Sequence, residues 1–128
     1  MAFIYIADDD ELLCDIVKAA LRDWGHTAGS VKNGDDVLTA IPIKKPDLVI
    51  LDCNMPGTSG LLVLRALRNT MEFYDLPVII LTACASAADE AIAMYEGAND
   101  YIRKPADPDF VAFRVDELLA ARARYACH

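Results

Sequence analysis

The chain has 128 residues, of which 55% are hydrophobic and 8% aromatic, and this size and composition predict one domain with a mainly aliphatic core. The 12 Lys and Arg against 20 Asp and Glu give a net charge of −8, which argues against unaided binding to nucleic acid or to an anionic membrane. The sequence has no apolar run of about 18 residues that could span a membrane, and its four cysteines form no C-x-x-C pair, so we expect a cytoplasmic protein with reduced thiols.

The first part of the chain alternates strand and helix patterns. Residues 3–7 (FIYIA) form an apolar run typical of a strand buried on both faces. Apolar residues at helical spacing follow, and Gly25 suits the end of that helix. The stripe comprises Leu13, Ile16, Val17, Ala20, Leu21 and Trp24. A weaker strand candidate covers residues 27–31 (TAGSV), and "NGDDVLTAI" predicts the start of a short second helix.

The second part of the chain repeats the alternation. Residues 47–51 (DLVIL) and 78–82 (VIILT) predict buried strands, residues 99–103 (NDYIR) a weaker strand, and residues 108–124 a last helix. Helical stripes follow the two buried strands, the second ended by Gly97: Leu61, Leu64, Leu67 and Met71, then Ala88, Ala91, Ile92 and Tyr95. Five β-α units joined by right-handed crossovers predict an α/β protein with a doubly wound, five-stranded parallel sheet.

Polar side chains stand at the carboxyl ends of four predicted strands. Asp8 and Asp9 follow the first strand, Asp52 follows the third, Thr82 ends the fourth, and Lys104 follows the fifth. In open α/β sheets these ends meet at the edge where ligands bind. Two carboxylates about 4 Å apart repel by about 4 kcal/mol at an effective dielectric constant near 20, so the acids either form a solvated turn or bind a cation. The set as a whole predicts a site for a divalent metal and a phosphoryl group.

Each residue alone also has a plainer explanation. Acidic residues 8–11 suit the start of a helix, where they face the positive end of its dipole. Asp52 could form the turn before "MPG", and Thr82 could be an ordinary β-branched strand residue. Lys104 is drawn towards an extended backbone by the proline that follows it. The prediction therefore depends on four strand ends agreeing.

Four motifs together resemble the receiver domain of two-component response regulators: "ADDD", "LVILDCNMPG", "VIILTA" and "GANDYIRKP". They lie in the order and at the spacing of that family and extend over nearly the whole chain. The resemblance implies a single receiver domain over residues 1–128 with the flavodoxin-like (βα)5 fold and strand order 2-1-3-4-5. It also implies a signalling switch, not an enzyme, apart from self-catalysed phosphoryl acceptance and slow autodephosphorylation.

The resemblance assigns the chemistry of the site. Asp52 matches the aspartate that accepts a phosphoryl group from a sensor histidine kinase or a phosphotransfer protein. Asp8 and Asp9 match the acidic pair that binds Mg²⁺ together with Asp52, and the backbone carbonyl of Asn54 matches a further ligand. Oxygen donors of this kind are what Mg²⁺ prefers in proteins.

The resemblance also assigns a switch. Thr82 matches the hydroxyl that hydrogen-bonds the phosphoryl group, Lys104 the ammonium that pairs with it, and Tyr101 the aromatic that changes rotamer on activation. The face formed by the fourth helix, fifth strand and fifth helix is then expected to bind a downstream protein or output domain. Arg114 could pair across a dimer interface there, but Asp116 lies where relatives often have a base, so we expect a different protein or a weak homodimer.

Further asparagine, cysteine and histidine positions bear on the site or on metal binding. Asn54 and Cys84 lie two places beyond Asp52 and Thr82, at positions that the family uses to tune the lifetime of the acyl phosphate. Cys53 and Cys84 could serve a redox or zinc function, although small hydrophobic residues near a loop are the commoner case. His26 and His128 have no metal-ligand spacing and are assigned no role.

Three other functions fit the sequence less well than a receiver domain does. An aspartyl-nucleophile phosphohydrolase of the haloacid dehalogenase type carries D-x-D on the first strand of its core, whereas here the candidate nucleophile follows the third strand and Asn54 replaces the second acid. A degenerate receiver that serves only as an interaction module would lack the acid pair, the acceptor or the lysine, and all are present. A nucleotide-binding protein would need a glycine-rich phosphate loop, and neither G-x-x-x-x-G-K nor G-x-G-x-x-G occurs.

Overall fold

A computed structural model describes residues 1–83 and 86–126 of the chain. Within these residues, five strands alternate with five helices, as predicted. The elements are β1 (Phe3–Ala7), α1 (Glu11–Asp23), β2 (Thr27–Val31), α2 (Gly34–Ile43), β3 (Leu48–Leu51), α3 (Gly60–Arg68), β4 (Val78–Thr82), α4 (Ala87–Tyr95), β5 (Asp100–Arg103) and α5 (Pro108–Ala126).

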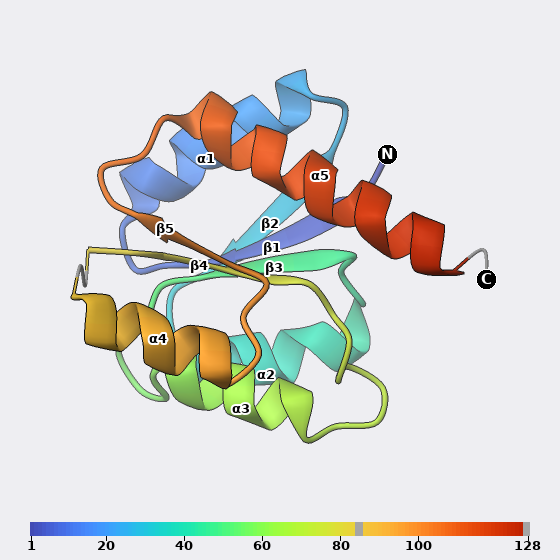
Figure 1. Cartoon of the computed structure of the whole chain (residues 1–128). Helices are drawn as coiled ribbons and strands as arrows, with labels where there is room; N and C mark the ends of the chain where they lie inside the picture. Colours follow the sequence, from blue (N-terminus) through green and yellow to red (C-terminus); the bar gives the residue numbers. More distant parts are fainter. Residues whose placement is uncertain (84–85, 127–128) are drawn as a thin grey trace.

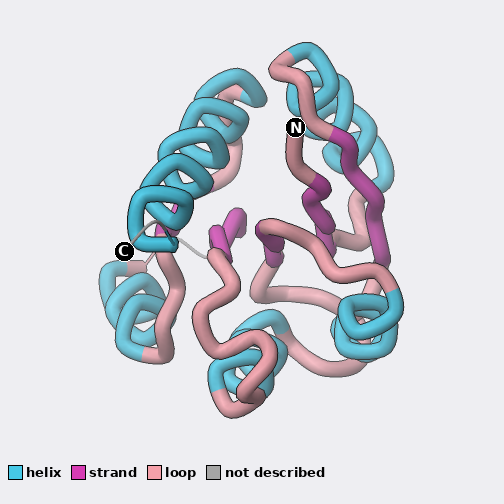
Figure 2. The backbone as a smooth tube through the Cα atoms, turned by 90° about the vertical axis from the view of Figure 1, so that its right-hand side faces the viewer, coloured by secondary structure: helices cyan, strands magenta, loops and turns pink. Residues whose placement is uncertain are grey.

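The strands form one parallel sheet in the order β2-β1-β3-β4-β5, which confirms the predicted doubly wound topology. Helices α1 and α5 cover one face, and α2, α3 and α4 cover the other (Figure 1). Figure 2 shows the strands lying between these two helical layers. The strand order reverses beside β1, because β2 lies on one side of it and β3 on the other. In such sheets the crevice at this reversal, beyond the carboxyl ends of the strands, is where ligands bind.

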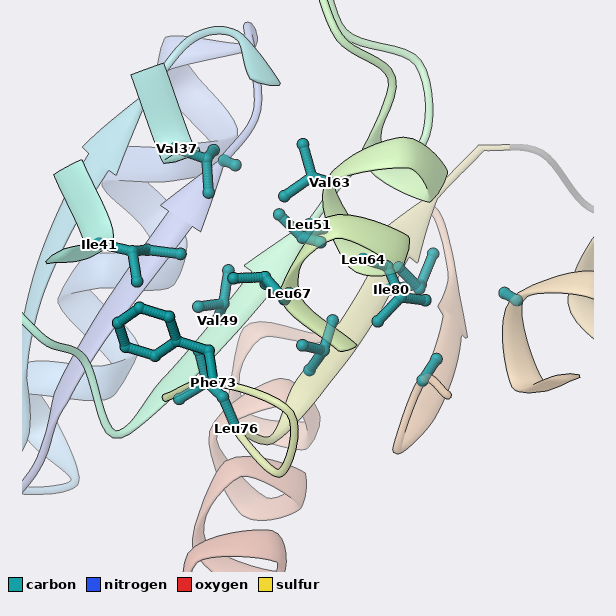
Figure 3. Packing of buried hydrophobic residues seen from close by; sticks show 14 of the residues in the cluster. Val37, Ile41, Val49, Leu51, Val63, Leu64, Leu67, Phe73, Leu76 and Ile80 are labelled. Carbon is teal, nitrogen blue, oxygen red and sulfur yellow. The ribbon is translucent and has the colours of Figure 1, made fainter. Parts of the chain in front are cut away.

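Two apolar clusters fill the spaces between the sheet and its helical layers. Successive side chains of a strand point to opposite faces, so Leu48 and Ile50 pack towards α1 and α5 while Val49 and Leu51 pack towards α2 and α3. Figure 3 shows part of the second cluster, in which Phe73 and Leu76 close the end below α3. Strands that are buried on both faces explain why the β3 and β4 sequences are continuously apolar.

Local sequence signals fix most helix ends. Side chains of Asp10, Asn33, Ser59 and Ser86 accept hydrogen bonds from backbone N–H groups in the first turns of α1, α2, α3 and α4. Gly25 and Gly97 have φ values of 91° and 107°, as expected of glycines that follow helices in the left-handed conformation.

The predicted apolar stripe of α4 is wrong. Ala88, Ala91, Ile92 and Tyr95 are all exposed, and the buried side chain of this helix is that of Ala93. Met71 is also wrongly placed, because α3 ends at Arg68 and Met71 is 92% exposed. Ile16 in α1 and Trp24, which directly follows that helix, are more exposed than the stripe predicted. Apolar periodicity cannot distinguish a helical face that packs on a sheet from one that faces solvent.

His26, to which the sequence assigned no role, has a structural one. Its Nδ1 accepts a hydrogen bond from the backbone N–H of Ala2 (3.1 Å), and its Nε2 donates to Asp116 Oδ1 (2.5 Å). This link ties the start of β2 to α5.

No helix within residues 1–83 or 86–126 is long and apolar enough to cross a lipid bilayer.

Candidate functional site

The sheet itself holds the candidate residues in place. Backbone hydrogen bonds extend the strand ladders into the site: Asp8 N–H donates to Val31 O (3.0 Å), Asp52 N–H to Ala7 O (2.9 Å) and Lys104 N–H to Thr82 O (2.9 Å). Among the described residues, the buried polar or charged side chains are those of Asp8, Asp52 and Thr82, with exposed fractions of 2%, 6% and 0%. Buried polar groups of this kind are costly, so their meeting at one sheet edge indicates a site.

Three carboxylates and one ammonium meet at this edge. Carboxylate oxygens of Asp8, Asp9 and Asp52 lie within 4.8 Å of one another, with Asp9 exposed to solvent. Lys104 Nζ donates to Asp8 Oδ2 at 2.6 Å and to Asp52 Oδ2 at 3.2 Å. The ammonium therefore bridges the two buried acids but leaves the cluster with two negative charges in excess.

The environment shifts two of these pKa values upwards. Burial raises the pKa of Asp8 above its ordinary value, and the hydrogen bonds from Lys104 and the Asp10 N–H only partly offset it. The negative charge of Asp52 raises it further. Burial alone would lower the pKa of Lys104, but the hydrogen bond to Asp8 and the charge of Asp52 outweigh it, so the pKa is raised and the ammonium is retained.

The donor set fits a hard divalent cation. Carboxylate oxygens can accept hydrogen bonds and bind metal at the same time, because each has more than one lone pair. Asp8 Oδ1 accepts from the Asp10 N–H (3.0 Å), and Asp52 Oδ1 accepts from the Asn54 N–H (3.1 Å), so both buried carboxylates are fixed in orientation. Asn54 itself is exposed on the loop after β3. A cation with two positive charges would balance the excess negative charge of the cluster.

Thr82 and Tyr101 share one face of the sheet. The register pairs Ile80 with Tyr101 and Thr82 with Arg103, so Tyr101 lies diagonally across from Thr82 on the neighbouring strand. Tyr101 is half-buried against the cluster that includes Ile80. Thr82 is fully buried at the carboxyl end of β4. Diagonal neighbours on one sheet face are close enough for a movement of one to affect the other.

The structure thus brings together Asp8, Asp9, Asp52 and Lys104, and places Thr82, Asn54 and Tyr101 on adjoining elements. Cys84 and His128 lie outside the described residues, so the interpretations of those two positions stay predictions. Cys53 is half-buried and lines a small cavity of about 210 Å³ with Leu61 and Ala93.

Sequence reasoning missed the contribution of Gly60. A Cβ atom built on Gly60 would lie 2.2 Å from the backbone oxygen of Asp52, so only glycine allows α3 to start this close to the candidate acceptor. The sequence signal is the second glycine of "MPGTSG", Gly60, which follows Gly57 by three residues.

Comparisons with known proteins identify the family and agree with the fold. The family model described as "Response regulator receiver domain" matches residues 4–116. DNA-binding response regulator MtrA of Mycobacterium tuberculosis is 36% identical over 112 residues, which cover 88% of this chain and 48% of MtrA. DNA-binding transcriptional regulator NtrC of Salmonella typhimurium is 36% identical over 126 residues, which cover 98% of this chain and 25% of NtrC. The chain therefore spans half or less of the length of these curated relatives.

Solved structures show the same fold. A putative response regulator from Chloroflexus aurantiacus superposes with a TM-score of 0.88 at 29% identity, covering 93% of this chain and 98% of that one. The receiver domain of the Francisella response regulator 1452 also has a TM-score of 0.88, at 27% identity, covering 95% of this chain and 99% of that one.

Proposed function

This chain belongs to the response regulator receiver domain family of two-component systems, and from that premise we propose that it is a phospho-accepting switch that takes a phosphoryl group on Asp52. The phosphodonor is a sensor histidine kinase or a phosphotransfer protein, and the response is a conformational change that controls a partner or output domain. A cytoplasmic location suits such partners and the reduced state of Cys14 and Cys53, which are not joined in a disulfide.

One observation carries the proposal: Asp52 is a nearly buried carboxylate that lies within hydrogen-bond reach of Lys104 and within metal-sharing distance of Asp8 and Asp9. A surface aspartate in a turn would not be held by the sheet ladder and an ammonium together. Incubation with a small phosphodonor and Mg²⁺ tests the proposal directly, because it should phosphorylate the parent protein and not the Asp52→Asn variant.

The residues have separate tasks in the transfer. The donor is a phosphohistidine of the kinase or phosphotransfer protein. A carboxylate oxygen of Asp52 attacks its phosphorus, the phosphorus–nitrogen bond breaks, and the electron pair of that bond leaves with the histidine imidazole. Such transfer depends on positioning and on neutralising charge more than on covalent help from the protein. Asp8, Asp9, Asp52 and the Asn54 carbonyl would hold Mg²⁺, which supplies positive charge to the phosphoryl oxygens when bound. Lys104 keeps its positive charge at neutral pH and can pair with the new phosphoryl group.

The face formed by α4, β5 and α5 is the proposed output surface. It exposes several large apolar side chains, namely Met94, Tyr95, Phe110 and Phe113. A groove of about 680 Å³ runs over β5 and α5 and is lined by Tyr101, Phe110 and Phe113 among others. A rotamer change of Tyr101 would therefore alter the shape of this groove. Exposed apolar area of this kind is typical of a surface that binds a partner.

Internal ion pairs favour a different protein over a second copy as that partner. Arg114 Nε bonds Asp100 Oδ2 (2.6 Å) and Arg114 Nη1 bonds Glu117 Oε1 (2.6 Å), while Arg103 pairs with Glu90. Arg103 and Arg114, the basic residues that line the groove, are thus engaged within the chain and are not free to hold a symmetric dimer together. We propose a heterologous partner, with at most a weak homodimer.

Mg²⁺ should stabilise the protein, because folding assembles the carboxylates that bind it. At a concentration about ten times the dissociation constant, the stabilisation is about 1.4 kcal/mol, which raises the Tm of a domain of this size by about 5 °C. The Asp9→Asn variant should show a smaller rise, and without metal it should be as stable as the parent or more so, since one repulsion is removed. Thermal melts of both proteins with and without Mg²⁺ measure this, and a parent Tm that ignores Mg²⁺ would refute the metal assignment.

As the pH is lowered, the affinity for Mg²⁺ should begin to fall at a higher pH than it would if Asp8 had the pKa of an ordinary aspartate. The metal needs Asp8 ionised, and burial raises the pKa of Asp8 above its ordinary value. Protonation of Asp8 therefore competes with Mg²⁺ at a higher pH than it would at an exposed aspartate. Mg²⁺ titrations at a series of decreasing pH values measure the effect. Affinity that stays constant down to the ordinary aspartate range would contradict it.

A further inference from the structure

The loop between β3 and α3, residues 52–59, contains both the proposed acceptor Asp52 and the proposed metal ligand Asn54. Within this loop, Met55 is anchored in the core with 8% of its surface exposed, whereas Asn54, Pro56 and Gly57 are exposed. The conformation of the exposed loop residues therefore depends on the element that the loop contacts. That element is the start of α2, which lies beside α3 on the same face of the sheet (Figure 1).

The carboxylate of Asp35 lies against two successive loop residues, Gly57 and Thr58. Thr58 Oγ1 donates a short hydrogen bond of 2.5 Å to Asp35 Oδ1. Gly57 has a φ of +74°, and a Cβ atom built on it would lie 2.7 Å from Asp35 Oδ2. Both oxygens of Asp35 thus face the loop, and only glycine permits the approach at position 57.

The backbone of α2 is equally close to the loop. Gly34 N–H donates to Pro56 O at 3.4 Å, and a Cβ atom built on Gly34 would lie 1.8 Å from Thr58 O. A side chain at position 34 would push α2 and the loop apart. Two glycines, one on each side, therefore let the Asp35 carboxylate reach Thr58.

Asp35 is not needed to begin its own helix. Asn33 caps α2 by accepting a hydrogen bond from the Asp36 N–H (2.8 Å), and its side-chain amide donates to Asp36 Oδ2 (2.9 Å). Asp36 carries the same charge one position along and is engaged with this cap. The side chain of Asp35 is directed to the loop instead.

We propose that Asp35, through Thr58, is a positioning residue that fixes the β3–α3 loop for Mg²⁺ binding beside Asp52. The inference rests on the proposed function. A loop fixed before binding does not have to lose conformational freedom when the metal arrives, and residues that orient metal ligands typically change metal affinity by about 10- to 100-fold when removed. Asp35 acts through the loop and has no direct contact with the metal.

An NMR titration with Mg²⁺, followed at the Asn54 amide, tests the proposal in the full chain. Asp35→Ala and Thr58→Val should each weaken Mg²⁺ binding about tenfold, and the double variant should be no weaker than either single one, because both remove the same contact. Asp35→Asn and Thr58→Ser keep the acceptor and the hydroxyl, so both should bind nearly as the parent does. Asp36→Ala, the matched control, removes an equal charge in the same turn and should leave the affinity unchanged.

Two further readouts separate positioning from general damage. In Asp35→Ala, amide hydrogen exchange in residues 54–58 of the metal-free protein should speed up while exchange in the strands stays as in the parent. The rate of Asp52 labelling at saturating Mg²⁺ should approach that of the parent, with only the half-saturating Mg²⁺ concentration raised.

Parental Mg²⁺ affinity in Asp35→Ala, or an equal loss in Asp36→Ala, would overturn the role of Asp35 and leave the proposed function intact. A parent protein that binds no Mg²⁺ would overturn both together.

Discussion

Acetyl phosphate and Mg²⁺ are expected to add one phosphoryl group to the parent protein, and Asp52→Asn is expected to abolish that labelling completely. The amide of asparagine is not a competent nucleophile, whereas the Asp52 carboxylate lies at the centre of the site with both oxygens oriented by hydrogen bonds from Asn54 N–H and Lys104 Nζ. Mass spectrometry of the intact protein measures the added group, and mapping after trapping with a strong nucleophile locates it.

The labelling experiment has a matched control in Asp75→Asn. Asp75 is a half-exposed aspartate that pairs with Arg122 and lines a cavity with Pro77 and Asn99, away from the site residues. Its variant should label as the parent does. Lys104→Ala should keep some labelling, because the nucleophile remains, but should respond weakly to it. Undiminished labelling in a folded Asp52→Asn protein would refute the assignment of the acceptor.

Beryllofluoride, a stable mimic of the phosphoryl group, is expected to shift NMR signals from Asp52 through Thr82 to Tyr101, α4 and α5. A ligand shifts a conformational equilibrium only by binding one state better, and Thr82 is a buried hydroxyl at the strand end next to the site. Thr82 and Tyr101 are diagonal neighbours on one sheet face. A movement of Thr82 towards the phosphoryl oxygens would let Tyr101 turn inwards and reshape the groove that Tyr101 lines.

Two substitutions at position 82 test that route. Thr82→Ala removes the hydroxyl and should abolish the distant shifts in β5, α4 and α5 while those of the immediate phosphate contacts persist. Thr82→Ser retains the hydroxyl and should restore most of the distant response. Distant shifts that survive in Thr82→Ala would rule out this route, and shifts confined to the phosphate contacts in the parent would show a site without a switch.

The exposed surface was the part of the fold that sequence patterns predicted least well. The apolar runs predicted all five strands within one residue, because burial on both faces of a parallel sheet demands continuous apolar runs. Helical spacing predicted the presence and order of the five helices, although the third was expected to reach Met71 and ends at Arg68. The same periodicity failed for α4, where the predicted stripe Ala88, Ala91, Ile92 and Tyr95 lies in solvent and Ala93 packs inwards. Spacing shows that a helix has an apolar face, but the neighbouring elements decide where that face points.

The sequence by itself determined which residues stand at the strand ends and hence which side chains meet at the candidate site. Asp8, Asp52 and Lys104 follow predicted strands, and the parallel topology requires those ends to meet at one edge. Chain order and strand polarity are local properties, which the pattern of a single chain can reveal.

The tertiary structure alone decided the pairing of groups that lie far apart in the chain. Lys104 bridges Asp8 and Asp52, His26 binds Asp116, and Asp35 binds Thr58. No spacing rule predicts such contacts, because they depend on how two elements pack and on glycines that allow a close approach at Gly34 and Gly57. The shift in the pKa of Asp8 arises in the same way, since burial and neighbouring charges exist only once the chain has folded.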